Sequence, residues 1–446
     1  MEEKTKTKKI ISAIFDNKAK IVEVETTFIK ALPGFSIVGL ASSAVQESKE
    51  RIKAALLNND FSFPPLKIIT NLSPANLPKK STALDLPIAL SILFQDREID
   101  LKDFLVLGEL GLDGSIKETN DIFAIVLNSG YKKVIVPSSI APKLAQIPDI
   151  EVYGFDNISE FFDLKLKKIK PTKLKYKFIE IDNKKYFYND KFELDFKDVK
   201  GQKIAKRVAL ISASGMHNIL LEGSAGIGKS MIIKRLAYIL PPVSLDELLE
   251  IEKNRALNNE NITFNPKRPV RFVHPNVSKP AIFGGRNKIG EIALANKGMI
   301  FFDEFPQFSK SILEDLRQPL QDKKVLVSRV DSKIEYEVDI LFASAMNPCP
   351  CGNLLSKTKE CRCSELEIKR YKNRLSEPLI DRIDLYLQMS EDTDESTITS
   401  KEMYKLVLNA FEKQVKRGCF NSNLPESYEF EMDEEAKNIL ESKNQF

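Results

Sequence analysis

The sequence predicts an α/β fold in which a parallel sheet lies between helices. The prediction rests on three apolar runs, at residues 219–221, 299–302 and 340–346, each of which reads as a buried strand. Glycine-rich or polar residues follow each run, and sheets of this kind bind ligands at the carboxyl ends of their strands. At 446 residues the chain is too long for one hydrophobic core, so more than one domain is expected.

The first part of the chain, from about residue 8 to 165, reads as one α/β unit. Strands are expected at 21–28, 35–40, 67–71, 134–137 and 151–155, with a helix at 44–58. The apolar segment 84–93 is a buried helix or a buried strand, and its periodicity does not decide between them. The next segment, 165–177, is rich in lysine and lacks a clear period, so a solvated linker is favoured over a DNA-binding strip.

The apolar run at 219–221 leads into a phosphate-binding loop. Residues 223–230 read Gly-Ser-Ala-Gly-Ile-Gly-Lys-Ser, a full match to G-x-x-x-x-G-K-[ST], and a helical pattern over 231–240 follows. In such loops the backbone N–H groups and the lysine bind phosphates, and the last hydroxyl is a ligand of Mg²⁺. The loop is therefore expected to bind ATP and Mg²⁺. Its predicted nucleotide-binding residues are Gly223, Ser224, Ala225, Gly226, Ile227, Gly228, Lys229 and Ser230.

The second apolar run ends in two carboxylates, Asp303 and Glu304. We expect Asp303 to bind the nucleotide and to hold Mg²⁺ together with Ser230, while Glu304 polarises the attacking water. An apolar run followed by Asp-Glu is a weak signal on its own. Here it follows a complete phosphate loop at the expected distance, which makes the catalytic interpretation the stronger one.

Three further groups complete the candidate site. Asn347 follows the third apolar run, where its amide is expected to orient water beside the γ-phosphate. Between the second and third runs, 325–330 and 332–338 predict a hairpin with Arg329 and Lys333 near its tip. Arg382 is a candidate to act on the nucleotide of a neighbouring subunit; a surface salt bridge with an adjacent aspartate is the alternative.

Several long motifs resemble the magnesium-chelatase-like AAA+ family known as YifB or ComM. In the ATPase part the resemblance includes Ala-Met-Asn-Pro-Cys-Pro-Cys-Gly at 345–352 and Leu-Ser-Glu-Pro-Leu-Ile-Asp-Arg-Ile-Asp at 375–384. In the first part it includes Leu-Pro-Gly-Phe-Ser-Ile-Val-Gly-Leu at 32–40 and Gly-Glu-Leu-Gly-Leu-Asp-Gly at 108–114. The motifs are independent of one another and cover nearly the whole chain.

The resemblance implies a domain order, a ring of identical subunits and DNA as a partner. It implies a Lon-protease-like domain at 1–164, a basic linker at 165–197, an AAA+ ATPase at 198–390, and at 391–446 the start of a helical lid that ends before the family's remaining lid helices. It also implies a ring, taken as a hexamer, that migrates DNA branches during natural transformation. In that ring Arg329 and Lys333 would face DNA in the pore, and Arg382 would be the trans-acting arginine.

Two other functions remain open. A chaperone-like remodelling ATPase, resembling the motor of magnesium chelatase, would use the same nucleotide site on a protein partner. A Lon-type peptidase is the weaker alternative, because such enzymes need a serine and a lysine base. The position that matches the nucleophilic serine of Lon falls on Ala83 or Asp85. Residues 118–123, where the lysine base would lie, contain no lysine.

Four of the five cysteines form two C-x-C pairs, Cys349 with Cys351 and Cys361 with Cys363. Four thiolates suit tetrahedral Zn²⁺, although the pairs are closer than the usual ligand spacing, so buried or free thiols are the alternative. The chain contains no apolar run long enough to span a membrane and no signal-peptide core. These features favour a cytoplasmic protein without a membrane partner, and a net charge of +4 says little about DNA.

Overall fold

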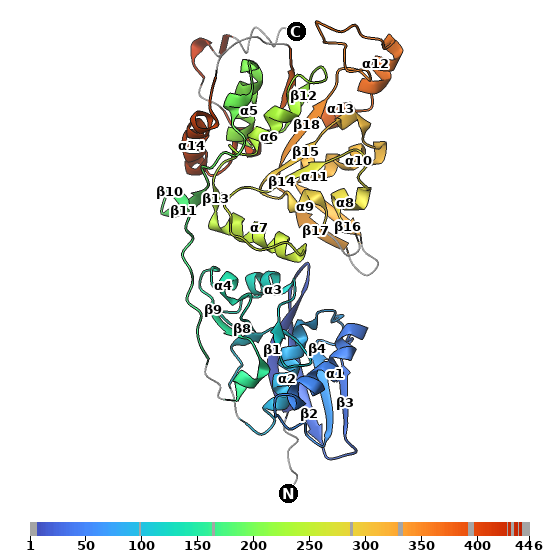
Figure 1. Cartoon of the computed structure of the whole chain (residues 1–446), viewed down its shortest axis with the longest axis vertical. Helices are drawn as coiled ribbons and strands as arrows, with labels where there is room; N and C mark the ends of the chain where they lie inside the picture. The colour runs from blue at the N-terminus through green and yellow to red at the C-terminus, as the bar shows by residue number, and fades with distance from the viewer. Residues whose placement is uncertain are drawn as a thin grey trace.

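The computed structural model describes residues 7–97, 100–162, 166–285, 289–328, 333–390, 397–425, 427–429, 432–435 and 437–438. Two α/β units follow one another along the long axis of the molecule, and a single extended segment of the chain connects them along one side (Figure 1). The first unit is built on a seven-stranded sheet and the second on a five-stranded sheet.

The sheet of the first unit has the order β3-β4-β2-β1-β5-β8-β9. Its strands are β1 (Thr7–Asp16), β2 (Lys18–Ile29), β3 (Gly34–Val38), β4 (Lys67–Ser73), β5 (Phe104–Val106), β8 (Lys133–Pro137) and β9 (Glu151–Phe155). The helices of the unit are α1 (Ser43–Leu57), α2 (Asp85–Leu93), α3 (Ile122–Asn128) and α4 (Ala141–Leu144), and β6 (Glu109–Leu110) pairs with β7 (Ile116–Lys117). The antiparallel pair β1–β2 joins the two halves of the sheet, and β5, β8 and β9 run parallel to β1.

The undecided segment at 84–93 is a helix. Residues 85–92 of α2 are all buried, which explains why the segment shows no amphipathic period. Burial of Asp85 is compensated by Arg51 of α1, whose Nε lies 3.0 Å from the carboxylate. The helix is therefore defined by tertiary packing that the pattern of apolar residues does not reveal.

The interpretation of 165–197 as a linker missed a β-hairpin. Strands β10 (Lys177–Ile181) and β11 (Lys184–Tyr188) pair with each other, and β11 also pairs with β13 (Val243–Ser244) of the ATPase unit. The turn residues Asp182 and Asn183 both have positive φ, at 49° and 62°, as the two central residues of a hairpin turn of this twist require. The second half of the predicted linker is thus a structured part of the second unit.

The sheet of the second unit has the order β14-β15-β18-β12-β19, and all neighbouring strands are parallel. Its strands are β12 (Ile219–Glu222), β14 (Val270–Val273), β15 (Met299–Phe302), β18 (Leu341–Met346) and β19 (Leu385–Gln388). The helices of this unit are α5 (Lys203–Gly215), α6 (Lys229–Leu236), α7 (Leu245–Leu257), α8 (Lys279–Phe283), α9 (Glu291–Leu294), α10 (Lys310–Asp315), α11 (Arg317–Asp322), α12 (Glu365–Lys372), α13 (Glu377–Ile380) and α14 (Ser400–Arg417). The predicted α/β fold with a parallel sheet is therefore confirmed.

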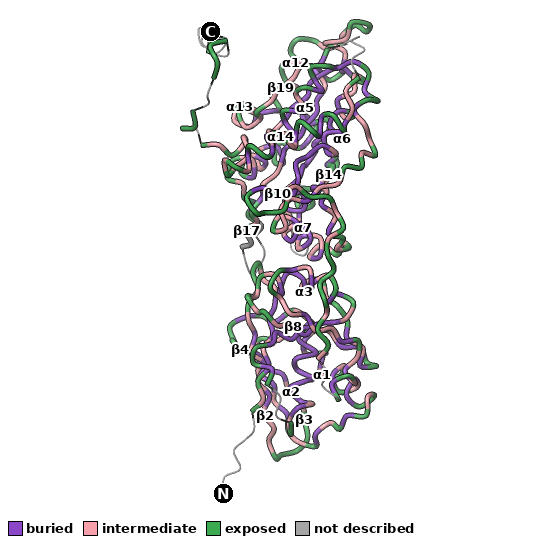
Figure 2. Tube along the Cα trace, turned by 90° about the vertical axis from the view of Figure 1, so that its left-hand side faces the viewer, coloured by how far each residue is buried: buried purple, intermediate pink, exposed green. Residues whose placement is uncertain are grey.

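Side chains alternate between the two faces of this sheet and so build two cores. Ile219 and Leu221 of β12 pack with α5, α6 and α14, whereas Leu220 between them packs with α8, α9 and α10. The same alternation separates Phe301 from Ile300 on β15. The central strands β12, β15 and β18 are buried along their whole length, whereas the edge strands β14 and β19 are partly exposed. The tube in Figure 2 is coloured by this burial.

The two units contact each other through α3 and α7, which face one another in both views (Figures 1 and 2). One core cluster contains side chains from both units, and in it the ring of Phe123 meets that of Phe264 edge to face at 6.1 Å. A shared apolar core links the ATPase unit to the first unit in addition to the connecting chain.

The predicted hairpin between the second and third apolar runs is present as β16 (Lys324–Ser328) and β17 (Lys333–Glu337). Arg329 lies outside the described residues, and of Lys333 only the backbone, at the start of β17, is described. In the segment where the lid is expected to start, α14 is present at Ser400–Arg417, whereas residues after 438 lie outside the described part of the chain. Among the described residues, no helix is both long and apolar enough to cross a membrane.

Candidate nucleotide site and cysteine cluster

The residues predicted to bind ATP meet at the carboxyl ends of three neighbouring strands. The phosphate loop follows β12, Asp303 and Glu304 follow β15, and Asn347 follows β18, which lies between β12 and β15 in the sheet. Because parallel strands point the same way, all three strand ends fall on one edge. The chain continues from β12 to the far strand β14 and later returns to both sides of β12, so this edge is also the point where the strand order reverses.

Glycines shape the phosphate loop where the backbone needs them. Gly226 and Gly228 have φ values of 82° and 101°, which side chains rarely allow, and α6 begins directly afterwards at Lys229. The amino end of α6 therefore points toward the loop and supplies positive potential there. The hydroxyl of Ser224 is buried in the loop and has no hydrogen-bond partner among the described residues, as expected of a loop whose polar groups serve a ligand.

Lys229 is the central cation of the site. Its Nζ donates to the carbonyls of Gly223 and Ser224, at 2.6 and 2.9 Å, and to Oδ1 of Asn347 at 3.1 Å. Burial lowers the pKa of Lys229 below its ordinary value, and the nearby carboxylates of Asp303 and Glu222 oppose the shift. The structure thus joins Lys229 to Asn347, although 118 residues separate them in sequence.

The two residues expected to hold Mg²⁺ are in direct contact. The Ser230 hydroxyl donates to Oδ2 of Asp303 at 2.9 Å, while Oδ1 of Asp303 accepts from the backbone N–H of Glu304 at 3.0 Å. A hydroxyl and a carboxylate oxygen are ligands that Mg²⁺ accepts, usually with water in its remaining positions. The residues present therefore fit Mg²⁺, which Ser230 and Asp303 would hold.

Glu304 has an unusual backbone conformation. Its φ of 52° lies in the left-handed region, which costs a residue other than glycine about 1 kcal/mol or more. Its side chain is exposed, unlike the strand residues before it. Such strain is common where a catalytic side chain must leave a strand at a particular angle.

Four residues that the sequence analysis did not identify surround the site. Glu222, the last residue of β12, is fully buried; its Oε1 lies 3.0 Å from Nζ of Lys372, and its Oε2 accepts from the hydroxyl of Tyr386. Burial raises the pKa of the neighbouring Tyr371 to about 12, and the backbone of Asn347 acts in the opposite direction. Only one signal pointed to this cluster in the sequence, a glutamate inside the apolar strand before the loop.

Arg382 lies at the opposite edge of the sheet from the phosphate loop. Its backbone carbonyl accepts from Asn218, which stands just before the amino end of β12, and Arg382 itself precedes β19. The guanidinium contacts Gln321 and the carbonyl of Pro378. The structure therefore does not bring Arg382 together with Lys229 or Asn347 within one chain.

The four clustered cysteines converge although two of them lie twelve residues or more from Cys349. Their Sγ atoms all lie within 4.8 Å of one another, with three measured pairs at 3.4, 3.7 and 3.7 Å. A disulfide would bring two sulfurs to about 2.05 Å. With Zn–S bonds of about 2.3 Å, the sulfurs of a regular tetrahedron lie about 3.8 Å apart. The cluster therefore has the spacing of a tetrathiolate zinc site.

The thiol of Cys351 has a lowered pKa, which favours its role as a metal ligand. Backbone hydrogen bonds from Arg362 and Asn353 lower the pKa of Cys351 to about 6, whereas burial and the neighbouring thiols raise the pKa of Cys361 and Cys363. Thiolates, and not thiols, bind zinc. Cys419, the fifth cysteine, is outside the cluster.

A phosphate loop, a Mg²⁺-binding carboxylate and a polar side chain on one edge of a parallel sheet define an ATPase of the P-loop class. Residues 195–397 match the family described as "Magnesium chelatase, subunit ChlI", and residues 22–140 match "Subunit ChlI of Mg-chelatase". The chain belongs to the YifB/ComM family of magnesium-chelatase-like AAA+ ATPases, as its curated relatives show.

Two of those relatives illustrate the extent of the match. The competence protein ComM of Haemophilus influenzae is 33% identical over 442 residues, which cover 93% of this chain and 84% of ComM. YifB of Salmonella typhimurium is 32% identical over 418 residues, covering 89% and 79%. Among solved structures, NtrX from Brucella abortus in complex with ADP matches with 16% identity and a TM-score of 0.28 over 43% of this chain and 36% of NtrX, too low to support a conclusion.

Proposed function

We propose that this chain is the subunit of a ring-shaped motor, taken as a hexamer, that hydrolyses ATP to move DNA branches in the cytoplasm, as a ComM-type helicase would. The observation that carries the proposal is the convergence of Lys229, Ser230, Asp303 and Asn347 at one sheet edge. DNA as the substrate is supported by kinship with a competence protein, since competence is the uptake of DNA.

Each residue of the site has a distinct task in the proposed hydrolysis. The phosphate loop and Lys229 bind the triphosphate; Ser230 and Asp303 would hold Mg²⁺, which when bound would supply positive charge beside the phosphates. Glu304 accepts a proton from the attacking water, and Asn347 orients that water beside the γ-phosphate. Lys229 and the backbone N–H groups of the phosphate loop would stabilise the negative charge that develops on the transferring group.

The position of Arg382 supports a role between subunits. Because it stands at the edge of the sheet opposite to its own phosphate loop, it is available to the nucleotide of a neighbouring copy. A guanidinium supplied in trans stabilises the transferring phosphoryl group, and such residues raise turnover by about 10³ or more. A ring of identical subunits would then share every active site between two chains.

We also assign the remaining parts to proposed roles. The first unit is a Lon-like scaffold: Ser81 caps a helical turn, and the amino group of the buried Lys79 donates to the carbonyl of Pro74. α14 begins the helical lid. Arg329 and Lys333, at the hairpin of β16 and β17, are candidates for contacts with DNA, and Zn²⁺ is the proposed metal of the four cysteines.

A remodelling ATPase that acts on a protein, as the magnesium chelatase motor does, is the second candidate. The matches to the magnesium chelatase families favour it, because they cover both units of the chain. A Lon-type peptidase has less support, since Lys79 is bound to a backbone carbonyl and Ser81 to a backbone N–H of its own turn.

ATPase stimulation distinguishes the first two candidates. A DNA motor should release phosphate faster when forked DNA is added, and the stimulation should fall steeply with salt because phosphate contacts release counterions. Replacing Arg329 and Lys333 by alanine should reduce the salt slope by about 2, one for each lost phosphate contact. Stimulation by a protein partner without any by DNA would overturn the DNA proposal in favour of remodelling.

A further inference from the structure

The segment that carries the cysteines has almost no apolar core of its own. From Cys351 to Arg374, a stretch that the structure describes in full, Gly352 is the only buried residue, and α12 has no buried side chain. Folded segments of this size need a metal or disulfides in place of a core. The four cysteines, with a metal bound, would therefore be the main interaction that stabilises the fold of this segment.

The first cysteine pair lies against the phosphate loop. Cys349 is fully buried two residues after Asn347, and the turn that it closes with Gly352 brings Gly352 over Ala225. A Cβ at Gly352 would lie 3.5 Å from Cβ of Ala225 and 3.8 Å from Cγ of Asn347. This half of the cluster thus packs directly on two nucleotide-binding segments.

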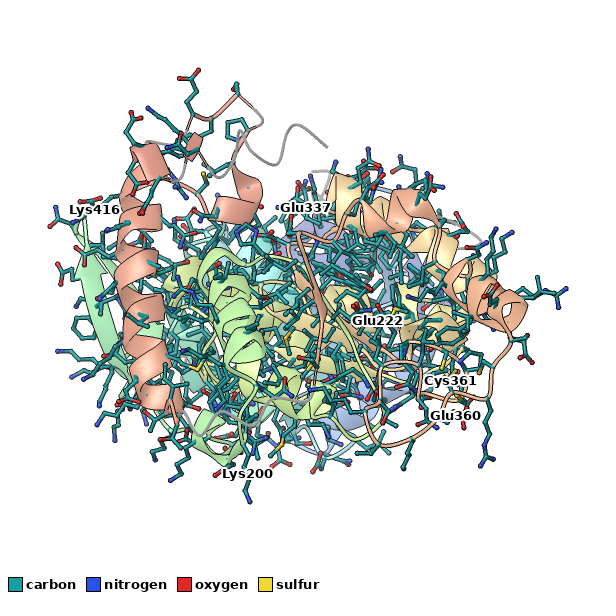
Figure 3. All side chains as sticks on the ribbon, turned by 90° about the horizontal axis from the view of Figure 1, so that it is seen from above. Lys200, Glu222, Glu337, Glu360, Cys361 and Lys416 are labelled. Atoms are coloured by element: carbon teal, nitrogen blue, oxygen red, sulfur yellow. The ribbon has the colours of Figure 1, made fainter. Side chains whose placement is uncertain are left out.

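The second cysteine pair reaches the same site through α12. The helix starts right after Cys363, with Ser364 as its N-cap, and ends at Tyr371 and Lys372. Tyr371 lies next to the backbone of Asn347, and Lys372 forms the ion pair with Glu222. Figure 3 shows Cys361 at the outer side of the molecule and Glu222 further inside.

The ion pair between Glu222 and Lys372 has a direct electrostatic consequence. Glu222 is a buried carboxylate one residue before the loop that must bind a polyanion. Without Lys372, Glu222 would keep the hydroxyl of Tyr386 but lose its ion-pair partner, and its negative charge would oppose binding of the phosphates. The position of Lys372, at the end of a helix held only weakly by packing, therefore matters for nucleotide affinity.

We propose that zinc bound by Cys349, Cys351, Cys361 and Cys363 sets the affinity of the phosphate loop for nucleotide, by holding α12 so that Lys372 neutralises Glu222. The inference rests on the proposed ATPase function and adds a metal-dependent control of its substrate binding. Loss of the metal would release α12, leave Glu222 uncompensated and weaken nucleotide binding.

The test measures zinc content and affinity for fluorescent ADP separately, in the full chain with Mg²⁺ and reductant. Wild-type protein should contain about one zinc per chain. A chelator selective for zinc over magnesium should weaken ADP binding about tenfold, and added zinc should restore it. Cys361→Ser with Cys363→Ser should reproduce the metal-free affinity, while Cys419→Ser, outside the cluster, should keep both zinc and affinity.

A second set of variants separates the ion pair from the metal. Lys372→Met should keep its zinc and still weaken ADP binding about tenfold, whereas Lys369→Met, an exposed lysine on the same helix, should bind as wild type. Adding Glu222→Gln to Lys372→Met should restore most of the affinity, because the uncompensated charge is then gone. In the Glu222→Gln protein, removal of zinc should have a much smaller effect than in wild type.

Three outcomes would overturn the inference. They are a reduced wild-type protein with little or no zinc, metal-free protein that binds ADP as tightly as the loaded form, and Lys372→Met that binds ADP as tightly as wild type. Circular dichroism spectra of all variants show whether the fold is intact, so a general unfolding is not mistaken for loss of control. Failure of zinc-loaded wild-type protein to bind any nucleotide would instead contradict the proposed ATPase itself.

Discussion

Lys229 directs all three of its N–H donors to groups that surround the phosphate position. Two of these groups are carbonyls of its own loop, and the third is the amide of Asn347. A phosphate must compete for these donors, so the lysine moves from carbonyl oxygens to anionic oxygens when nucleotide binds. Charged acceptors form the stronger hydrogen bonds, which makes the exchange favourable.

The first prediction separates binding from chemistry at single residues. Lys229→Ala should abolish detectable nucleotide binding, because the site loses its only cation that contacts both the loop and Asn347. Glu304→Gln should bind ATP as wild type but hydrolyse it about 10²- to 10³-fold more slowly, since the amide cannot accept the proton of water. Fluorescent ATP binding and phosphate release, measured on the same preparations, check both. Unchanged turnover in Glu304→Gln would remove Glu304 from the proposed role.

The second prediction concerns Arg382. Arg382→Ala should keep nucleotide binding and lose about 10³-fold in turnover, because its guanidinium lies far from its own loop. Mixing Arg382→Ala with Glu304→Gln subunits should recover part of the activity, since mixed rings contain interfaces with one intact glutamate and one intact arginine. The mixture should exceed the sum of the separate variants in phosphate release. A mixture no more active than that sum, at every ratio, would contradict a trans role.

At the scale of elements, the short motifs of the ATPase sheet were predictable because each is local. A phosphate loop after β12 and carboxylates after β15 require only that each strand and its following turn form as their sequences indicate. The cluster of Glu222, Tyr371, Lys372 and Tyr386 was not predictable in this way. The other three residues follow Glu222 by about 150 residues or more in the sequence, and only the folded sheet brings them close to it.

The hairpin of β10 and β11 was predictable but missed. The alternation of residues 177–181 and 184–188 around Asp182-Asn183 is a hairpin signal, and the excess of lysine obscured it. By contrast, the helix α2 was undecidable from its pattern, since burial on every side removes the amphipathic period. The hairpin could therefore have been predicted from its local sequence, whereas the helix α2 depends on tertiary packing.

The third prediction is made for the contact between α3 and α7. Phe264→Ala should lower the free energy of unfolding by about 3 kcal/mol, because Phe264 is buried against Phe123 in a core shared by both units. Leu32→Ala is the matched control: Leu32 is 88% exposed, and its loss should change stability by less than about 0.5 kcal/mol. Chemical denaturation followed by circular dichroism measures both. Equal stabilities of the two variants would show that the shared core contributes little.

At the scale of the whole molecule, the two units have different roles in the proposed ring. The ATPase unit places its loop on one edge of the sheet and Arg382 on the other, so in that proposal a complete site would be formed by two chains. The shared core around α3 and α7 ties the first unit to this ATPase, which suits a scaffold that moves with the motor. The membership of the chain in the YifB/ComM family agrees with a nucleotide-driven machine of this plan.

The most direct measurement is phosphate release by the purified chain with ATP and Mg²⁺, with and without forked DNA, beside Glu304→Gln under the same conditions. The account predicts steady hydrolysis by the wild type, faster with DNA, and loss of at least about 10²-fold in the variant. Hydrolysis that persists undiminished in Glu304→Gln would contradict it, and so would a wild-type chain that neither retains nucleotide nor releases phosphate.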